Sequence, residues 1–281
     1  MEGLEDSIVE LIRQAATDLP CDVESALRDL RAKSGGVARE VLDTILENIS
    51  IAREKSLPIC QDTGTPVFYV RHPQKVSQQD LRQNILSAVA RATVEVPLRA
   101  NAVDAVCGKN SGDNIGPGMP VILFQESDEN KVAVDLMLKG GGSENATFLY
   151  KLPDRTLSAG RDLAGVEKCV LDAVYRTQGK ACSPNIIGVG IGGLSGTSIS
   201  FSQKQFFRRI DDVNPDENLA RLEKSLLEKA NSLGIGPMGL GGGPSVLAVK
   251  AGKLARHPAS FFVAVSFMCW ASRVKTLEVE V

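Results

Sequence analysis

The chain has 281 residues, of which 43% are hydrophobic and 23% charged, and its formal net charge is -2. This composition is that of a globular protein with a sizeable core, and the absence of a dense Lys/Arg run argues against nucleic-acid binding. No apolar stretch reaches the roughly 18 residues of a membrane helix, and the acidic N-terminus does not resemble a signal peptide. We therefore expect a cytoplasmic protein with no membrane or nucleic-acid partner.

Helical periodicity dominates the N-terminal part of the chain. Apolar residues recur at three- and four-residue intervals over residues 3–55, with breaks at Pro20 and at Gly35–Gly36. Ser77 followed by Asp80 predicts the N-cap of a further helix. The later helices are predicted over residues 77–94, 163–178 and 215–233.

Short runs rich in Val and Ile predict strands in the rest of the chain. They cover residues 65–70, 120–125, 131–138, 186–191, 245–250 and 260–268. Because helices and strands do not alternate steadily, we predict an α+β fold with short strands and glycine-rich loops. We expect one domain over residues 1–281, made of a helical lobe over about 1–58 and a mixed α/β part over about 59–281.

Glycines gather in four clusters, at residues 140–142, 188–193, 234–236 and 239–243. Such clusters let the backbone approach a ligand closely and present N–H groups to anions. The alternative is that they only form turns. The 188–193 cluster lacks the G-x-G-x-x-G spacing at the start of a helix that dinucleotide binding requires, and no Walker A pattern is present.

Six cysteines are scattered along the chain without a CxxC pair. This argues against a disulfide framework and against structural zinc. Cys169 lies in a helical apolar pattern and is predicted to be buried. Cys60, Cys182 and Cys269 lie at polar or glycine-rich boundaries. Thiolates from separate loops can converge on an iron–sulfur cluster, but spacing alone leaves open that all the cysteines are structural.

Six motifs resemble, in the same order, those of the class I (iron–sulfur) fumarase and L-tartrate dehydratase family. They are Ile59–Thr65, Gly140–Asn145, Cys182–Gly193, Gly234–Gly239, His257–Ala259 and Cys269–Arg273. The resemblance implies a [4Fe-4S] cluster on Cys60, Cys182 and Cys269, with one iron open to substrate. It implies a hydro-lyase, an enzyme that reversibly hydrates or dehydrates a small dicarboxylate of the fumarate/malate or tartrate type.

The resemblance also implies substrate contacts. They are expected from Gln61, Asp62, Arg99, Gly141, Gly142 and His257. Asp62 and His257 are also expected to be catalytic, as groups that hold or relay a proton. The residues alone leave simpler interpretations open: Arg99 could form a surface ion pair, and His257 could be a structural histidine before a proline.

Two departures from the family pattern bear on partner and substrate. The sequence stops 12 residues after Cys269, where two-chain members of the family divide. It therefore resembles an α subunit, and we expect a β subunit to complete the active site in an α2β2 heterotetramer. Gly243–Ser245 replaces the Thr-rich segment expected in fumarases, so the dicarboxylate stays open, as does the role of Cys107. The rival hypotheses are a cluster-binding redox sensor without catalysis and a metal-free binding protein.

Overall fold

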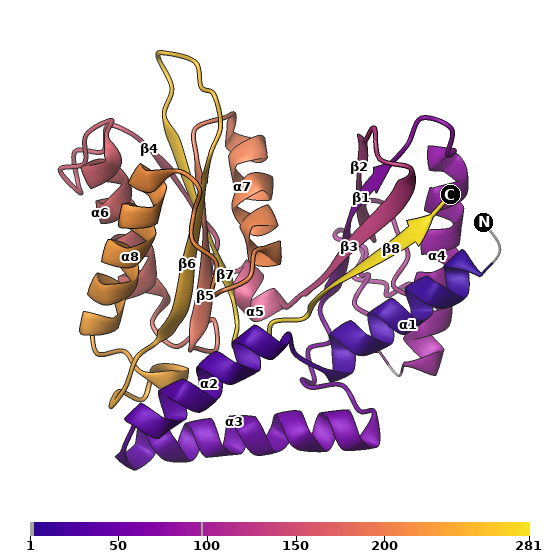
Figure 1. Cartoon of the computed structure of the whole chain (residues 1–281), viewed down its shortest axis with the longest axis horizontal. Helices are drawn as coiled ribbons and strands as arrows, with labels where there is room; N and C mark the ends of the chain where they lie inside the picture. Colours follow the sequence, from indigo (N-terminus) through magenta and orange to yellow (C-terminus); the bar gives the residue numbers. More distant parts are fainter. Residues whose placement is uncertain (1–2, 97) are drawn as a thin grey trace. The chain divides into compact units, whose positions relative to one another are not determined.

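The computed structural model describes residues 3–96 and 98–281 and confirms the α+β class (Figure 1). The chain divides into two compact units. Unit 1 comprises Met1–Pro20, Glu47–Gly141 and Arg273–Val281, and unit 2 comprises Cys21–Leu46 and Gly142–Ser272. Both units draw on the helical first 58 residues and on the later α/β part, and the expected domain boundaries stay a prediction. In the described part of the chain, no helix is long and apolar enough to cross a membrane.

Unit 1 is a four-stranded sheet packed against two helices. The strand order is β2-β1-β3-β8, and only the β1–β2 pair is parallel. Apolar side chains of the helices, such as Ile12 and Ile85, share a core with Phe68 and Leu136 of the sheet. Its elements are α1 Leu4–Thr17, β1 Thr65–His72, α4 Gln78–Glu95, β2 Val121–Glu126, β3 Lys131–Lys139 and β8 Val274–Glu280.

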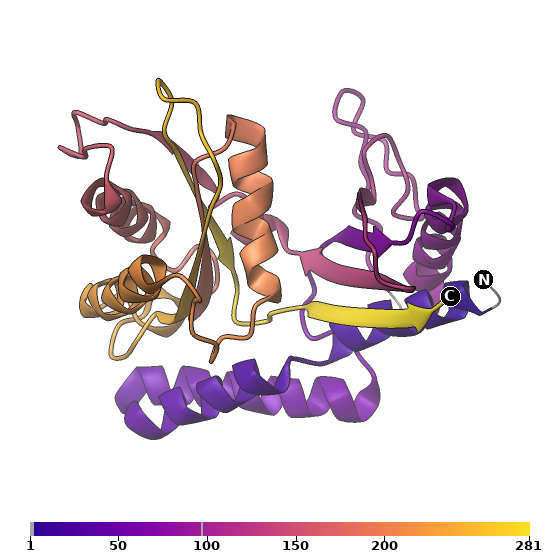
Figure 2. The same cartoon turned by 45° about the horizontal axis from the view of Figure 1, so that its top comes forward.

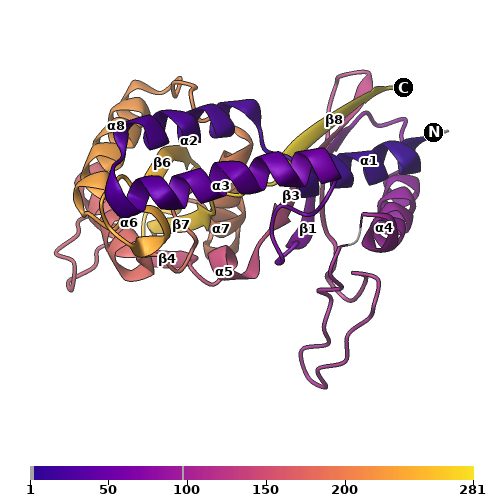
Figure 3. The ribbon, with the colours of Figure 1, turned by 90° about the horizontal axis from the view of Figure 1, so that it is seen from below.

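Unit 2 is a four-stranded sheet with helices on both faces. The strand order is β4-β7-β5-β6, with α6 and α8 on one face and α7 on the other (Figures 1 and 2). The helices α2 and α3 lie side by side (Figure 3), and the residues of α3 after Leu46 belong to unit 1. The elements are α2 Cys21–Lys33, α3 Gly36–Lys55, α5 Gly141–Glu144, β4 Phe148–Lys151, α6 Leu163–Thr177, β5 Asn185–Ile191, α7 Ser195–Lys204, η1 Gln205–Phe207, α8 Glu217–Ser232, η2 Pro237–Gly239, β6 Val246–Lys253 and β7 Phe262–Met268.

The predicted helices and strands are confirmed to within a few residues. The breaks at Pro20 and Gly35–Gly36 separate α1, α2 and α3, as expected. Ser77 caps α4, and its hydroxyl accepts a hydrogen bond from the Asp80 N–H at 3.2 Å. Six elements were not predicted, namely the helices α5 and α7, the strands β4 and β8, and the short helices η1 and η2.

Gly188 and Gly190 lie inside β5 and not in a ligand-binding loop. A Cβ atom on Gly188 would lie 2.1 Å from the carbonyl oxygen of Ser202, and one on Gly190 would lie 2.3 Å from that of Ser198. Both carbonyls belong to α7, so these glycines allow the helix backbone to pack directly on the sheet. The interpretation that they approach a ligand is therefore wrong for these two positions.

Replacing Gly190 by alanine is expected to destabilise unit 2. The new methyl group overlaps backbone atoms of α7, and overpacking of this kind costs about 3 kcal/mol of unfolding free energy. The control is Gly196→Ala in the first turn of α7, where nothing lies within 4 Å of the added Cβ. Urea unfolding of both variants measures the difference, and equal stabilities would contradict the packing role of Gly190.

Candidate active site

Asp62 is fixed at three points in unit 1. Its Oδ1 accepts a hydrogen bond from the Gly64 N–H at 3.0 Å, and its Oδ2 accepts one from the Gly141 N–H at 2.8 Å. Its carbonyl oxygen accepts a hydrogen bond from Nη1 of Arg273. Gly141 therefore orients the Asp62 carboxylate, and a direct contact of Gly141 with substrate stays a prediction.

The backbone on both sides of Cys60 is also fixed. Gly64 has a φ of +80°, and a Cβ there would lie 2.7 Å from the carbonyl carbon of Leu138, so this close passage over β3 requires glycine. On the other side, the carbonyl of Ile59 accepts a hydrogen bond from Asn48 Nδ2 at 2.9 Å. The thiol of Cys60 is thus presented by a short loop with little conformational freedom.

Arg99 and Gln61 present exposed side chains next to this loop. The N–H of Arg99 donates to Thr63 Oγ1 at 3.1 Å, and its carbonyl accepts from Asn114 Nδ2 at 3.0 Å. No described residue forms an ion pair or hydrogen bond with the Arg99 guanidinium. The surface ion pair that the sequence left open is therefore absent, and the guanidinium is available to an anion.

Arg273 is a buried cation beside Asp62. The side chain is 1% exposed, its Nε has no hydrogen-bond partner, and no carboxylate in the described residues lies within ion-pair distance. Arginine stays charged in proteins, and a buried charge is costly unless an opposite charge is close. The surroundings of Asp62 are therefore electrostatically suited to an anionic group.

Cys182 and Cys269 lie on neighbouring backbone segments at one end of the unit 2 sheet. Cys182 precedes β5, Cys269 follows β7, and these strands are antiparallel with Ile186 opposite Met268. The N–H of Trp270 donates to the carbonyl of Cys182 at 3.2 Å. The structure thus brings together two of the three predicted ligand positions.

Cys182 has a strained backbone. Its φ is +54°, in the left-handed region that residues other than glycine rarely adopt. Its N–H donates to the carbonyl of Gly179 at 3.0 Å, and the next residue, Ser183, is held by hydrogen bonds of 2.8 Å to the Gly236 carbonyl and from the Met238 N–H. The motif Gly234–Gly239 therefore supports the turn that carries Cys182.

His257 lies at the opposite end of the unit 2 sheet from these cysteines. It belongs to the loop between β6 and β7 (Figure 1), whereas Cys269 follows the far end of β7. Seven strand residues separate the two ends by roughly 23 Å. The exposed ring accepts a hydrogen bond from the Ala259 N–H at Nδ1, at 3.1 Å, so the neutral ring carries its proton on Nε2.

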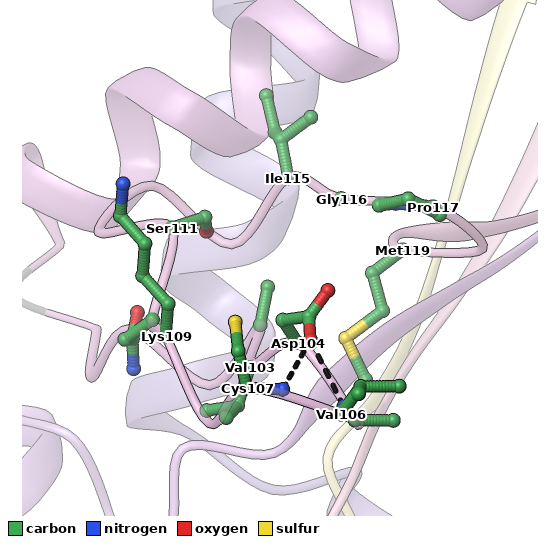
Figure 4. Close-up of a pocket in the computed structure, with 13 residues that line it drawn as sticks. Val103, Asp104, Val106, Cys107, Lys109, Ser111, Ile115, Gly116, Pro117 and Met119 are labelled. Carbon is green, nitrogen blue, oxygen red and sulfur yellow. Dashed lines mark hydrogen bonds between the residues drawn. The ribbon is translucent and has the colours of Figure 1, made fainter.

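Cys107 lies in the long segment between α4 and β2, where it lines a cavity of about 540 Å³ (Figure 4). Oδ1 of Asp104 accepts hydrogen bonds from the N–H groups of Cys107 and Val106 at 2.7 and 2.9 Å. These bonds, that of Cys107 first, lower the pKa of Asp104. The N–H of Cys107 bonds within its own turn, and its thiol is exposed. Cys107 is therefore a control for the three cysteines that are predicted to bind the cluster.

Cys169 is confirmed as a core residue. It is 0% exposed in the cluster that joins α6 to the unit 2 sheet, and burial, followed by the charges of Asp154 and Asp172, raises its pKa to about 12. A thiol with that pKa stays protonated and unreactive near neutral pH. We expect mass spectrometry of the folded chain after iodoacetamide treatment to find Cys107 alkylated and Cys169 unmodified. Alkylation of both at equal rates would contradict the burial.

No three His, Cys, Asp or Glu side chains are grouped as a single-ion metal site within residues 3–96 and 98–281. None of the six cysteines is in a disulfide. A cluster whose thiolates each bind a different iron is not a single-ion site of this kind.

Comparison with known proteins identifies the family. The chain belongs to the fumarate hydratase (fumerase) family, whose sequence model matches residues 5–278. The chain is 46% identical over 280 residues to a putative class I fumarate hydratase of Geobacillus stearothermophilus, covering 97% of this chain and 54% of that protein. It therefore spans about half the length of that relative.

Two further relatives are named as subunits. A putative L(+)-tartrate dehydratase subunit alpha of Methanocaldococcus jannaschii is 37% identical, with 96% of this chain and 95% of the relative covered. The L(+)-tartrate dehydratase subunit alpha of Escherichia coli K12 is 34% identical, with 98% and 90% covered. The family resemblance predicted from the six motifs is confirmed.

Proposed function

We propose that this chain is the α-type part of a hydro-lyase that adds water to, or removes it from, a small dicarboxylate. The observation that carries the proposal is the pair of neighbouring turns that hold Cys182 and Cys269 in a chain of the fumarate hydratase family. The names of its relatives favour fumarate/malate or tartrate as the substrate.

The residues fit a [4Fe-4S] cluster on Cys60, Cys182 and Cys269. Thiolates are the ligands such clusters require, and none of the three cysteines is in a disulfide. The strained backbone of Cys182 and the unpaired buried cation Arg273 are the features expected around a bound anionic group. A cluster with three protein ligands supplies a Lewis-acidic iron for the substrate hydroxyl and carboxylate.

The protein groups have distinct proposed roles. The Arg99 guanidinium binds a substrate carboxylate, for which its fork of donors is suited. The Asp62 carboxylate, held by two backbone N–H groups, holds or relays a proton. Arg273 positions Asp62 by donating a hydrogen bond to the Asp62 carbonyl, and its positive charge offsets negative charge nearby. Gln61 and the Gly142 backbone provide further polar contacts.

A β subunit is proposed to complete this site, in an α2β2 assembly. Two relatives that this chain matches over nearly their whole length are named as alpha subunits. The class I relative is about twice as long as the region matched here. The additional substrate-binding groups and the main base are therefore assigned to the partner.

His257 is proposed to act on the thiol site of a second copy of the chain. Within one copy, roughly 23 Å of β7 separates His257 from Cys269, too far for one small dicarboxylate to touch both. In a symmetric pair of chains, each chain can place its His257 in the site of the other.

Co-expression of His257→Ala with Cys182→Ser chains, together with the β subunit, tests this exchange. Each mixed pair has one site with intact thiols and an intact histidine, so about a quarter of the wild-type activity is expected at random pairing. Each variant expressed alone is expected to be inactive. A mixture with no activity would assign His257 to the site of its own chain, and an active His257→Ala variant would show that His257 belongs to no site.

Anaerobic reconstitution with iron and sulfide tests the proposed cofactor. The chain is expected to bind about four irons and to develop broad brown absorbance. A change in its electron paramagnetic resonance spectrum on adding a dicarboxylate favours the hydro-lyase over a redox sensor. A chain that binds no iron, with its fold intact, would favour the metal-free binding protein.

A further inference from the structure

A small cationic cavity lies at the thiol end of unit 2. Its volume is about 250 Å³, and we call it the Arg176 pocket. Two of its lining side chains are cations and none is acidic. The lining residues are Gly142, Asn145, Ala146, Phe148, Arg176, Thr177 and Lys180.

Three polar side chains of the Arg176 pocket, other than Arg176 itself, lack partners among the described residues. In the part of the chain that the structure describes, the Lys180 ammonium and the Asn145 amide make no hydrogen bond or ion pair. Oγ1 of Thr177 is buried without a hydrogen-bond partner. These donors, gathered at one cavity, are complementary to an anion that carries several acceptor oxygens.

Arg176 is oriented by an aromatic ring and, among the described residues, has one weak polar contact. Its guanidinium carbon lies 4.7 Å from the ring centroid of Phe148, and its Nη1 lies 3.4 Å from Oδ2 of Asp172. That same oxygen accepts a shorter bond of 2.7 Å from the Tyr150 hydroxyl. Burial and this bond raise the pKa of Tyr150, so the hydroxyl stays protonated and donates its hydrogen bond to Asp172. The remaining edge of the guanidinium can bind a carboxylate.

The Arg176 pocket adjoins the turn that carries Cys182. The N–H of Lys180 donates to the Thr177 carbonyl, and the N–H of Cys182 donates to the Gly179 carbonyl, both at 3.0 Å. A Cβ on Gly142 would lie 3.6 Å from the carbonyl oxygen of Lys180. A ligand in the pocket therefore lies next to Gly142, the residue proposed above to contact substrate.

We propose that the Arg176 pocket binds a carboxylate group of a small organic acid. Arg176 takes the carboxylate through its guanidinium edge, and Lys180 and Asn145 donate to it from the other lining positions. The carboxylate belongs either to the substrate itself or to a second acid bound beside it. The link to Gly142 rests on the proposed function, whereas anion binding in the pocket does not.

Calorimetric titration of the full, cluster-free chain with succinate tests the site, because succinate has neither the alkene nor the hydroxyl needed for turnover. The double variant Arg176→Gln/Lys180→Gln is expected to bind at least about tenfold more weakly, since two charged donors are lost. The matched control, Arg155→Gln/Lys224→Gln, removes the same charge from exposed positions of unit 2 outside the pocket lining.

Equal affinity in the wild-type chain and the pocket variant would overturn the proposal, as would equal weakening in both double variants. Arg176 also lies in the last turn of α6 and Lys180 follows shortly after its end, where cations stabilise a helix. A lower melting temperature without weaker binding would assign them that role alone and also overturn it. If the double variant does not fold, the exposed Lys180→Gln change alone is expected to weaken binding severalfold. Unchanged succinate affinity in Lys180→Gln would overturn the proposal.

Steady-state kinetics of the iron-loaded complex with its β subunit distinguish the two sources of the carboxylate. A raised KM in Lys180→Gln assigns the pocket to the substrate's own carboxylate. An unchanged KM, with loss of an effect of added succinate on turnover, assigns it to a second acid. Both outcomes support the site. Succinate binding that persists in Cys182→Ser, which is expected to bind no cluster, separates this inference from the proposed function.

Discussion

Replacing Cys182 by serine is expected to abolish assembly of the iron–sulfur cluster. The alkoxide of serine is a poor substitute for a soft thiolate, and only three cysteines are proposed as ligands. Iron and sulfide content after anaerobic reconstitution is expected to fall from about four irons per chain to near zero. Cys60→Ser and Cys269→Ser are expected to behave in the same way.

Cys107→Ser and Cys169→Ser are the matched controls for these variants. Cys107 is exposed in a separate turn, and Cys169 is buried among the core residues of unit 2. Both variants are expected to keep the full iron content, although Cys169→Ser also introduces a hydroxyl into the core and lowers stability. Loss of iron in either control, with the fold retained, would show that the ligand assignment is wrong.

Replacing Arg273 by methionine is expected to separate stability from activity. The change removes a buried charge that has no carboxylate partner within residues 3–96 and 98–281, and apolar replacement of such a charge is often neutral or stabilising. It also removes the hydrogen bond to the Asp62 carbonyl. A small displacement of a catalytic group costs on the order of 100-fold in rate. Turnover of the complex should fall by about that factor while the cluster-free chain keeps its melting temperature.

The control for Arg273→Met is Arg71→Met, which removes a partly exposed arginine 3.7 Å from Asp135 in the same sheet. It is expected to leave turnover unchanged. A large loss of stability in Arg273→Met with proportionate loss of activity would mean that Arg273 is only structural. Arg273→Lys keeps the charge, and partial recovery of turnover is expected from it.

The sequence predicted most of the fold because most elements carry a clear hydrophobic period. It did not predict α7, a run rich in Ser, Thr and Gly with low helix propensity. That helix is stabilised by tertiary contacts, including a bond of 3.0 Å from Ser198 to the Gly190 carbonyl. The edge strand β8 was also missed, although Leu277 and Val279 alternate in sequence and pack on the unit 1 core.

The candidate site was predicted unevenly from the sequence. Motifs singled out Cys182 and Cys269, but their proximity depends on the antiparallel pairing of β5 with β7, which is a long-range contact. Arg273 belongs to a recognised motif, yet its burial cannot be inferred from a single charged residue, which is usually exposed. The position of His257 at the other end of the sheet likewise depends on strand order.

Turnover by the reconstituted chain with its β subunit tests the hydro-lyase assignment most directly. Fumarate, L-malate and L(+)-tartrate are supplied anaerobically, and formation or loss of the hydroxyl acid is followed by chromatography. We predict conversion of at least one of these acids, dependent on both subunits and abolished by Cys182→Ser. A complex with about four irons per chain that converts none of them would contradict the assignment and favour the redox sensor.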